Sequence, residues 1–111
     1  KQILILDDET SIAEFVALYL ENEGAECSFV STKIELTNML TQNKQFDIFI
    51  TDMILPDLTG AESVALVLEK YPEIKVYSMS GYLSLEDRDW IYPVLRKPFN
   101  SKELQKFMLD N

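Results

Sequence analysis

The chain has 111 residues, of which 47% are hydrophobic, and it carries a formal net charge of −9. This length predicts one domain over residues 1–111 with a hydrophobic core, and no apolar run approaches the ~20 residues that a membrane span needs. The excess of acidic residues argues against direct nucleic-acid binding, which needs clustered lysine and arginine. Histidine is absent and there is one cysteine, which excludes histidine-based catalytic triads and an intrachain disulfide.

The first half of the chain alternates short apolar runs with helical patterns. The run Ile3–Leu6 is apolar throughout, which predicts a strand buried on both faces. A capping-box pattern at Ser11 and Glu14 predicts the start of a helix, and Gly24 is placed to end it. The next predicted elements are a strand over 25–30, a helix capped by Thr32 and Glu35, and a strand over 46–51.

The second half continues this alternation. Thr59 and Glu62 predict the start of a helix after a loop, and the segment Ser84–Ile91 predicts a short helix without a strong apolar stripe. The other predicted elements are a strand over 75–79, a brief strand at Val94 and Leu95, and a last helix capped by Asn100 and Glu103. Strict alternation of strands and helices predicts an α/β fold, in which helices cover both faces of a parallel sheet.

Polar side chains follow the carboxyl ends of four of these strands. They are Asp7, Asp8 and Glu9 after the first strand, Asp52 after the third, Ser80 after the fourth and Lys97 after the fifth. Because the carboxyl ends of parallel strands meet at one edge of the sheet, we expect these groups to converge. Clustered carboxylates repel one another, and a divalent cation such as Mg²⁺ relieves this repulsion. Such a site suits phosphoryl transfer to a carboxylate.

The order and spacing of four motifs extend over essentially the whole chain. They are the run 3–9 ending in Asp7-Asp8-Glu9, the run 51–57 with Gly60, the run 79–82, and the run 96–99. Together they resemble the receiver domain of two-component response regulators. The run 79–82 resembles receivers fused to hybrid histidine kinases and also some stand-alone receivers that lack an aromatic switch residue. The resemblance implies a flavodoxin-like (βα)5 doubly wound sandwich, with a five-stranded parallel sheet in the order 2-1-3-4-5 and a short fourth helix.

The resemblance also implies a role for the acidic residues. Asp52 is the implied phosphoacceptor. Asp7, Asp8 and Asp52 are the implied Mg²⁺ ligands, together with the backbone carbonyl of Ile54. We expect phosphorylation and dephosphorylation of Asp52 alone, with no turnover of an independent substrate.

Two further residues and the partners follow from the same resemblance. Ser80 is expected to hydrogen-bond the phosphoryl group and Lys97 to pair with it, and the Lys97–Pro98 peptide bond is expected to be cis. Because the chain lacks histidine, the phosphoryl donor is expected to be a histidine kinase or a histidine phosphotransfer domain. We expect a cytoplasmic location. Since the chain begins at Lys1 and not at methionine, we expect a piece of a longer protein or a trimmed chain, and a linked kinase or output domain outside these residues stays open.

Several positions bear on how such a domain would signal. Val94 stands where the family usually carries an aromatic switch residue, and we therefore expect a different signal output. Ile54 and Tyr82 are expected to flank the path of hydrolytic water, which predicts slow loss of the phosphoryl group. Trp90 is open to two interpretations, as an anchor for a partner or as a cover for a thin part of the core beside Tyr92.

Two other functions compete with the receiver. A phosphatase like the haloacid dehalogenases also combines an aspartate nucleophile, a hydroxyl, a lysine and Mg²⁺. That family needs two aspartates separated by one residue after its first strand, and here the residue two after Asp7 is Glu9. A receiver that serves only as an unphosphorylated docking module is the second alternative. The complete set of polar residues speaks against it, whereas Val94 favours it.

Overall fold

The computed structural model describes residues 1–81 and 89–111 of the chain. In chain order its elements are β1 (Gln2–Leu6), α1 (Thr10–Asn22), β2 (Glu26–Val30), α2 (Lys33–Leu40), β3 (Ile48–Asp52), α3 (Gly60–Lys70), β4 (Lys75–Ser80), β5 (Val94–Arg96) and α4 (Ser101–Asp110). The five strands pair in parallel in the order β2-β1-β3-β4-β5, which confirms the predicted sheet. Over the ranges 1–81 and 89–111, no helix has both the length and the apolar character of a membrane span.

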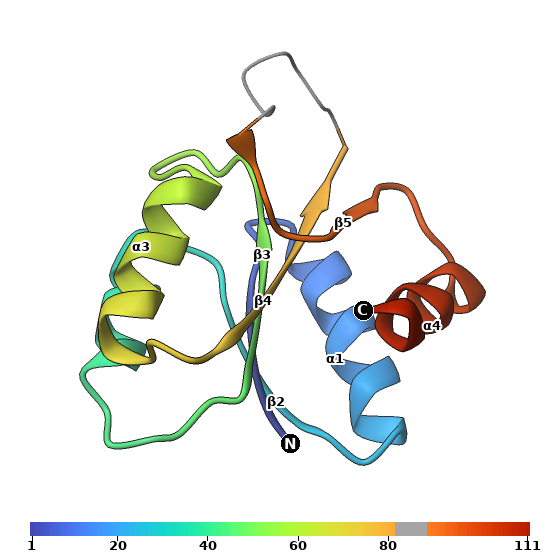
Figure 1. The fold of residues 1–111 in the computed structure, drawn as a ribbon, viewed down its shortest axis with the longest axis horizontal. Coiled ribbons are helices and arrows are strands. Elements are labelled where there is room, and N and C mark those ends of the chain that lie inside the picture. The colour runs from blue at the N-terminus through green and yellow to red at the C-terminus, as the bar shows by residue number, and fades with distance from the viewer. Residues whose placement is uncertain (82–88) are drawn as a thin grey trace.

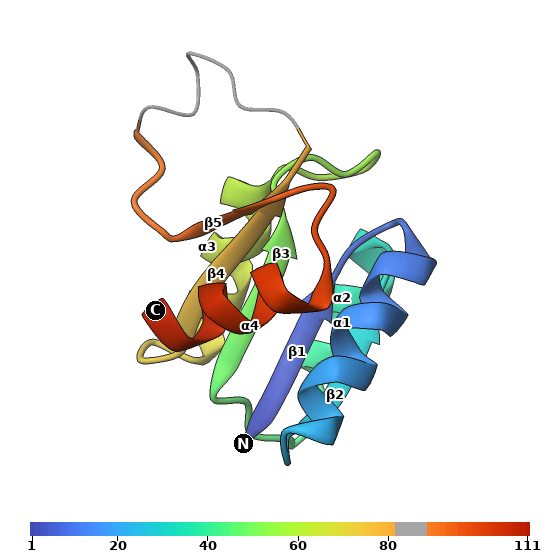
Figure 2. The same cartoon turned by 90° about the vertical axis from the view of Figure 1, so that its right-hand side faces the viewer.

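Helices cover both faces of the sheet, as the alternation predicts (Figure 1). Helices α2 and α3 lie on one face, and α1 and α4 lie on the other, where Figure 2 shows them in front of the strands. Each face has its own hydrophobic cluster: Leu4 and Phe49 belong to the α2–α3 side, and Ile5 and Ile50 belong to the α1–α4 side. Successive residues of β1 and β3 are therefore buried on opposite faces, which explains why both strands read as continuous apolar runs.

The start of α1 differs from the prediction. The helix begins at Thr10 with Glu9 as its N-cap residue, so the capping box predicted at Ser11 and Glu14 is wrong, and no side chain of the described residues caps this helix. The backbone amide of Glu9 instead donates to Oδ1 of Asp7 (2.9 Å). The hydrogen bond between the Glu9 amide and the Asp7 carboxylate thus fixes the turn that precedes α1, and the helix begins one residue before Ser11.

The other predicted helix boundaries are largely confirmed. Gly24, with φ of 97°, ends α1 through hydrogen bonds from its own amide to Glu21 and from the Ala25 amide to Leu20, both 3.0 Å long. Full capping boxes begin α3 and α4. At the start of α2, Thr32 accepts from the amide of Glu35 as predicted, but the Glu35 carboxylate accepts from the amide of Ser31 (2.8 Å). The amide of Lys33, the first residue of this helix, donates to the Asp57 carboxylate in the loop between β3 and α3 (2.8 Å).

The segment before β5 bears on the two interpretations of Trp90. The helix predicted over Ser84–Ile91 falls mainly on residues 82–88, which lie outside the described residues. Trp90 is partly buried and packs against the hydrophobic cluster of the α2–α3 side, with its ring centroid 5.4 Å from that of Tyr92. Its indole N–H donates to Oγ of buried Ser78 (2.8 Å). These contacts favour the interpretation of Trp90 as a cover for the core.

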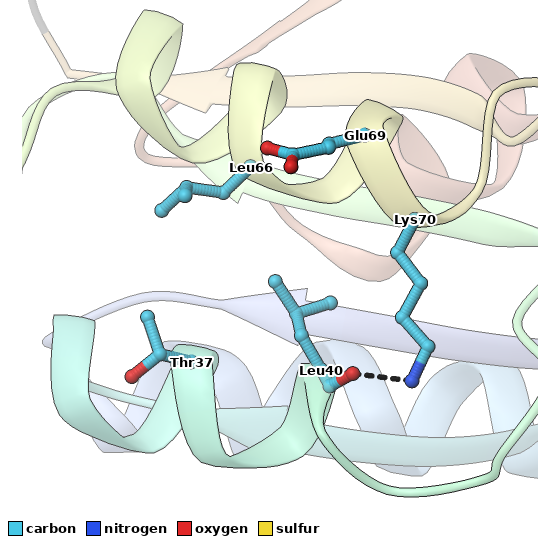
Figure 3. Close-up of a pocket in the computed structure, with 5 residues that line it drawn as sticks. All are labelled: Thr37, Leu40, Leu66, Glu69 and Lys70. Atoms are coloured by element: carbon cyan, nitrogen blue, oxygen red, sulfur yellow. Dashed lines mark hydrogen bonds between the residues drawn. The ribbon is translucent and has the colours of Figure 1, made fainter.

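A pocket of about 350 Å³ lies between α2 and α3 (Figure 3). It is lined by Thr37, Leu40, Leu66, Glu69 and Lys70. Lys70 extends from the end of α3 and donates hydrogen bonds to the carbonyl oxygens of Leu40 and Gln42 (2.5 Å). The bond to Leu40 satisfies a carbonyl that the end of α2 leaves without a helical partner, and the bond to Gln42 holds the chain just after this helix. Together they attach the end of α2 to α3.

Candidate functional site

Three aspartates meet at the carboxyl edge of the sheet. Asp7 and Asp8 follow β1, and Asp52 ends β3. Because Leu6 pairs with Thr51 in the register of these neighbouring strands, the residues that follow lie side by side. One carboxylate oxygen from each aspartate lies within 4.8 Å of the others. Asp7 and Asp52 are buried, with 0% and 7% exposure, whereas Asp8 is exposed. The structure thus brings together all three carboxylates that the sequence predicted.

Lys97 reaches the same cluster from the segment after β5. Its Nζ lies 2.8 Å from Oδ2 of Asp7, 3.3 Å from Oδ2 of Asp52 and 3.3 Å from Oε1 of Glu9. The Lys97 side chain is only 9% exposed, and the Lys97–Pro98 peptide bond is cis, as predicted. Glu9 has no role in the sequence-based assignment, although its position directly after the two aspartates marks it as a neighbour of the site.

Burial governs the protonation of the inner groups. Desolvation raises the pKa of Asp7, although hydrogen bonds from Lys97 and from the Glu9 amide oppose it. Desolvation likewise raises the pKa of Asp52; the charge of Lys97 opposes this shift and the charge of Asp7 adds to it. Desolvation alone lowers the pKa of Lys97, but its hydrogen bond to Asp7 and the surrounding carboxylate charges outweigh burial and raise it. The site thus holds three aspartate carboxylates and one ammonium, and its inner groups are poorly solvated. This excess of negative charge favours a divalent cation.

The loop between β3 and α3 places the main chain of Ile54 two residues beyond Asp52. The amide of Gly60 donates to the carbonyl of Met53 (2.7 Å), and the amide of Leu55 donates to that of Leu58 (3.1 Å). Ile54 occupies the bridge position between these two bonds, where a residue directs its amide and carbonyl away from the paired segment. The Ile54 carbonyl thus takes no part in this pairing, as the role of a metal ligand requires. Ile54 is 62% exposed.

Ser80 lies at the end of β4, beside the backbone of the Lys97 segment. The residue is buried, with 2% exposure, and its carbonyl accepts from the amide of Lys97 (2.9 Å). In the register of β4 and β5, Ser80 pairs with Arg96, and Val94 pairs with Ser78. Val94 is half-buried at the position of the expected aromatic switch. The strand ends thus bring Ser80 and Lys97 to the same edge as the aspartates.

Comparison with known proteins identifies the family. The model of the response regulator receiver domain matches residues 3–108. The chain belongs to the response regulator receiver domain family. Among curated proteins, this receiver domain is 30% identical over 106 residues to the heme response regulator HssR of Staphylococcus saprophyticus, and the alignment covers 91% of the chain and 46% of HssR. It is 25% identical over 109 residues to the receiver protein CpdR of Brucella abortus, covering 94% of the chain and 90% of CpdR.

The solved structures agree with this family and with the fold. A CheY-like receiver domain protein from Methanospirillum hungatei superposes on this receiver domain with a TM-score of 0.86 and 30% identity, covering 99% of this chain and 91% of that chain. The receiver domain spans less than half of HssR but nearly all of CpdR. These likenesses favour a receiver domain over the phosphatase.

Proposed function

We propose that this receiver domain, over residues 1–111, accepts a phosphoryl group on Asp52 with the help of Mg²⁺ and acts as a switch in a two-component phosphorelay. One observation carries the proposal: carboxylate oxygens of Asp7, Asp8 and Asp52 lie within 4.8 Å of one another, and the Lys97 ammonium contacts two of these residues. A carboxylate nucleophile beside a cation and a metal-binding cluster is the arrangement that phosphoryl transfer requires.

The donor groups fit Mg²⁺ by their chemistry. Asp7, Asp8 and Asp52 supply carboxylate oxygens, and Ile54 supplies a carbonyl outside the loop pairing; oxygen ligands of this kind are those that Mg²⁺ prefers. Buried negative charge in excess of the Lys97 ammonium gives the ion a favourable site. When bound, Mg²⁺ neutralises oxygens of the transferred phosphoryl group. We assign the ion to these four residues.

The chain's own residues then carry the transfer. A carboxylate oxygen of Asp52 attacks the phosphorus of a phosphohistidine; the new P–O bond forms as the P–N bond breaks, and the electron pair returns to the imidazole nitrogen. Lys97 pairs with one phosphoryl oxygen, and the Ser80 hydroxyl donates to another. Because the chain holds no histidine, the donor is a histidine kinase or a histidine phosphotransfer domain, and we infer that the exchange takes place in the cytoplasm.

The test of this function is a mass measurement on the intact domain. After incubation with Mg²⁺ and acetyl phosphate, the wild type should gain one phosphoryl group. Asp52→Asn should gain none, because an amide has no nucleophilic carboxylate oxygen. Asp110→Asn, at an exposed position at the end of α4, is the matched control and should be phosphorylated normally. An adduct that persists in Asp52→Asn refutes the assignment. Turnover of phosphate esters would support the phosphatase, and no adduct with any donor would support the docking module.

The phosphorylated domain is expected to lose its phosphoryl group slowly. The apolar side chain of Ile54, two residues after Asp52, offers no hydrogen bond to an attacking water. Replacing it with asparagine should speed the loss about tenfold, which corresponds to about 1.4 kcal/mol of activation free energy, whereas Ile54→Val should match the wild type. The decay of the adduct, followed by intact mass, checks this, and a wild-type lifetime of seconds would contradict it. Tyr82, the second residue expected beside this water path, lies outside the described residues.

A further inference from the structure

Two buried hydroxyl groups are in contact between the end of β3 and the first turn of α3. Thr51 and Ser63 are both 0% exposed, and their hydroxyl oxygens lie 3.2 Å apart. Oγ1 of Thr51 donates to the carbonyl of Asp52 (2.8 Å), and Oγ of Ser63 donates to the carbonyl of Gly60 (2.7 Å). The hydroxyl pair therefore contacts the main chain of the proposed phosphoacceptor and of the first residue of α3.

The two hydroxyl groups carry two hydrogens but make three contacts: one with each carbonyl and one with each other. When each hydroxyl donates to its carbonyl, no hydrogen remains for the contact between the two oxygens, in keeping with the greater length of that contact. Thr51 and Ser63 thus serve two main-chain carbonyls rather than each other. Either hydroxyl can be removed without leaving the other as a buried, unpaired donor, so single substitutions are compatible with folding.

The two carbonyls stand at the two ends of the loop that carries Ile54. Asp52 ends β3, and Gly60 begins α3. Between these ends, the amide of Gly60 donates to the carbonyl of Met53 (2.7 Å). This main-chain hydrogen bond joins the two ends of the loop. The two hydroxyl bonds lie on either side of it, each to a carbonyl close in the sequence, and the two hydroxyl oxygens are in contact between them. This loop and its ends supply two of the four groups assigned to Mg²⁺, the Asp52 carboxylate and the Ile54 carbonyl.

We infer that Thr51 and Ser63 are positioning residues, which hold the Asp52 carboxylate and the Ile54 carbonyl at the spacing that Mg²⁺ binding requires. This inference rests on the proposed function. Neither hydroxyl contacts the proposed ligand atoms; both act through the main chain at the ends of the loop. Apolar side chains of the same shape would fill these buried positions without the cost of burying a hydroxyl, so packing alone does not account for them.

A pair of substitutions at Thr51 separates the hydroxyl from the packing. Thr51→Val keeps the shape and removes the hydroxyl, whereas Thr51→Ser keeps the hydroxyl and removes a buried methyl group. Loss of one hydrogen bond should raise the Mg²⁺ dissociation constant of Thr51→Val about fivefold, as measured by calorimetric titration of the unphosphorylated domain. Thr51→Ser should stay within about twofold of the wild type, although its thermal stability falls. Ser63→Ala should resemble Thr51→Val.

Amide hydrogen exchange gives an independent readout at the base of the loop. The Gly60 amide should exchange faster in Thr51→Val and in Ser63→Ala than in Thr51→Ser. Equal Mg²⁺ affinity in Thr51→Val and the wild type overturns the inference, and so does a loss of affinity that follows stability in all three variants. A wild type that binds Mg²⁺ but accepts no phosphoryl group refutes the proposed function alone, because the comparison at Thr51 still decides the positioning role. A wild type that does not bind Mg²⁺ refutes the metal assignment and this inference together.

Discussion

Replacement of Lys97 with methionine is expected to lower the free energy of unfolding of the metal-free domain by about 3 kcal/mol at neutral pH. The Lys97 ammonium lies 2.8 Å from Asp7 and 3.3 Å from Asp52, and both carboxylates are buried. Methionine fills a similar volume, but it leaves the two aspartates without the cation that pairs with both. Breaking a buried pair from one side is costly because the remaining charge stays desolvated.

Lowering the pH and adding Mg²⁺ should each restore much of the free energy of unfolding that Lys97→Met loses. Folding raises the pKa values of Asp7 and Asp52 above 3.8, and loss of Lys97, whose charge lowers both, raises them further. A group whose pKa is raised by folding binds more protons in the folded state, so stability rises as pH falls through the raised pKa toward the unfolded value. Lys97→Met should therefore gain more stability than the wild type on going from neutral pH to about pH 5.

Urea unfolding with EDTA or with Mg²⁺, at both pH values, measures these effects. Lys102→Met, at an exposed position of α4, is the matched control and should change stability by no more than about 0.5 kcal/mol. Equal stability of Lys97→Met and Lys102→Met in EDTA at neutral pH would contradict the prediction, since it would mean that the buried carboxylates do not need the ammonium.

The second large effect is expected at Gly60. A Cβ atom added there would lie 2.9 Å from Cα and 3.1 Å from the carbonyl oxygen of Met53, and both are main-chain atoms that cannot rotate away. Alanine is the better helix former by about 1 kcal/mol, but we expect this overlap to dominate and Gly60→Ala to destabilise the domain by about 2 kcal/mol. Because the displaced backbone leads directly to Ile54, Mg²⁺ affinity should also fall about tenfold.

Gly24→Ala provides the matched control for Gly60→Ala. An added Cβ at Gly24 would meet nothing within 4 Å, but the residue has a φ of 97°, so alanine there costs stability by backbone strain alone. Both variants should unfold at lower temperature, and only Gly60→Ala should bind Mg²⁺ more weakly in a calorimetric titration. Wild-type Mg²⁺ affinity in Gly60→Ala would show that the loop absorbs the overlap without moving the ligands.

The elements that the sequence predicted correctly depend on local patterns. Ile3–Leu6 is a strand because its residues are buried on both faces, and the convergence of Asp7, Asp52 and Lys97 follows from the alternation of strands and helices. The start of α1 was mispredicted because a capping box at Ser11 is a local pattern, whereas the actual turn into the helix depends on the Asp7 carboxylate and the Glu9 amide.

The contacts that could not be predicted join residues far apart in the sequence. Thr51 and Ser63 are separated by a loop and a helical turn, and each looks like an ordinary polar residue of its own element. Their meeting depends on how closely α3 approaches β3, which Gly60 permits by lacking a side chain. Neither a periodicity nor a motif encodes that distance.

Helix α2 is only eight residues long, too short to be stable by itself, and its two ends are held from outside. The Asp57 carboxylate accepts from the amide of Lys33 at the first residue (2.8 Å), and the Lys70 ammonium donates to the last residue, Leu40. An anion at the amino end and a cation at the carboxyl end both complement the helix macrodipole. Since Asp57 precedes α3 and Lys70 ends it, α2 cannot slide along its own axis without α3, and the two helices should respond to events at Asp52 as one rigid unit whose cohesion weakens with increasing salt.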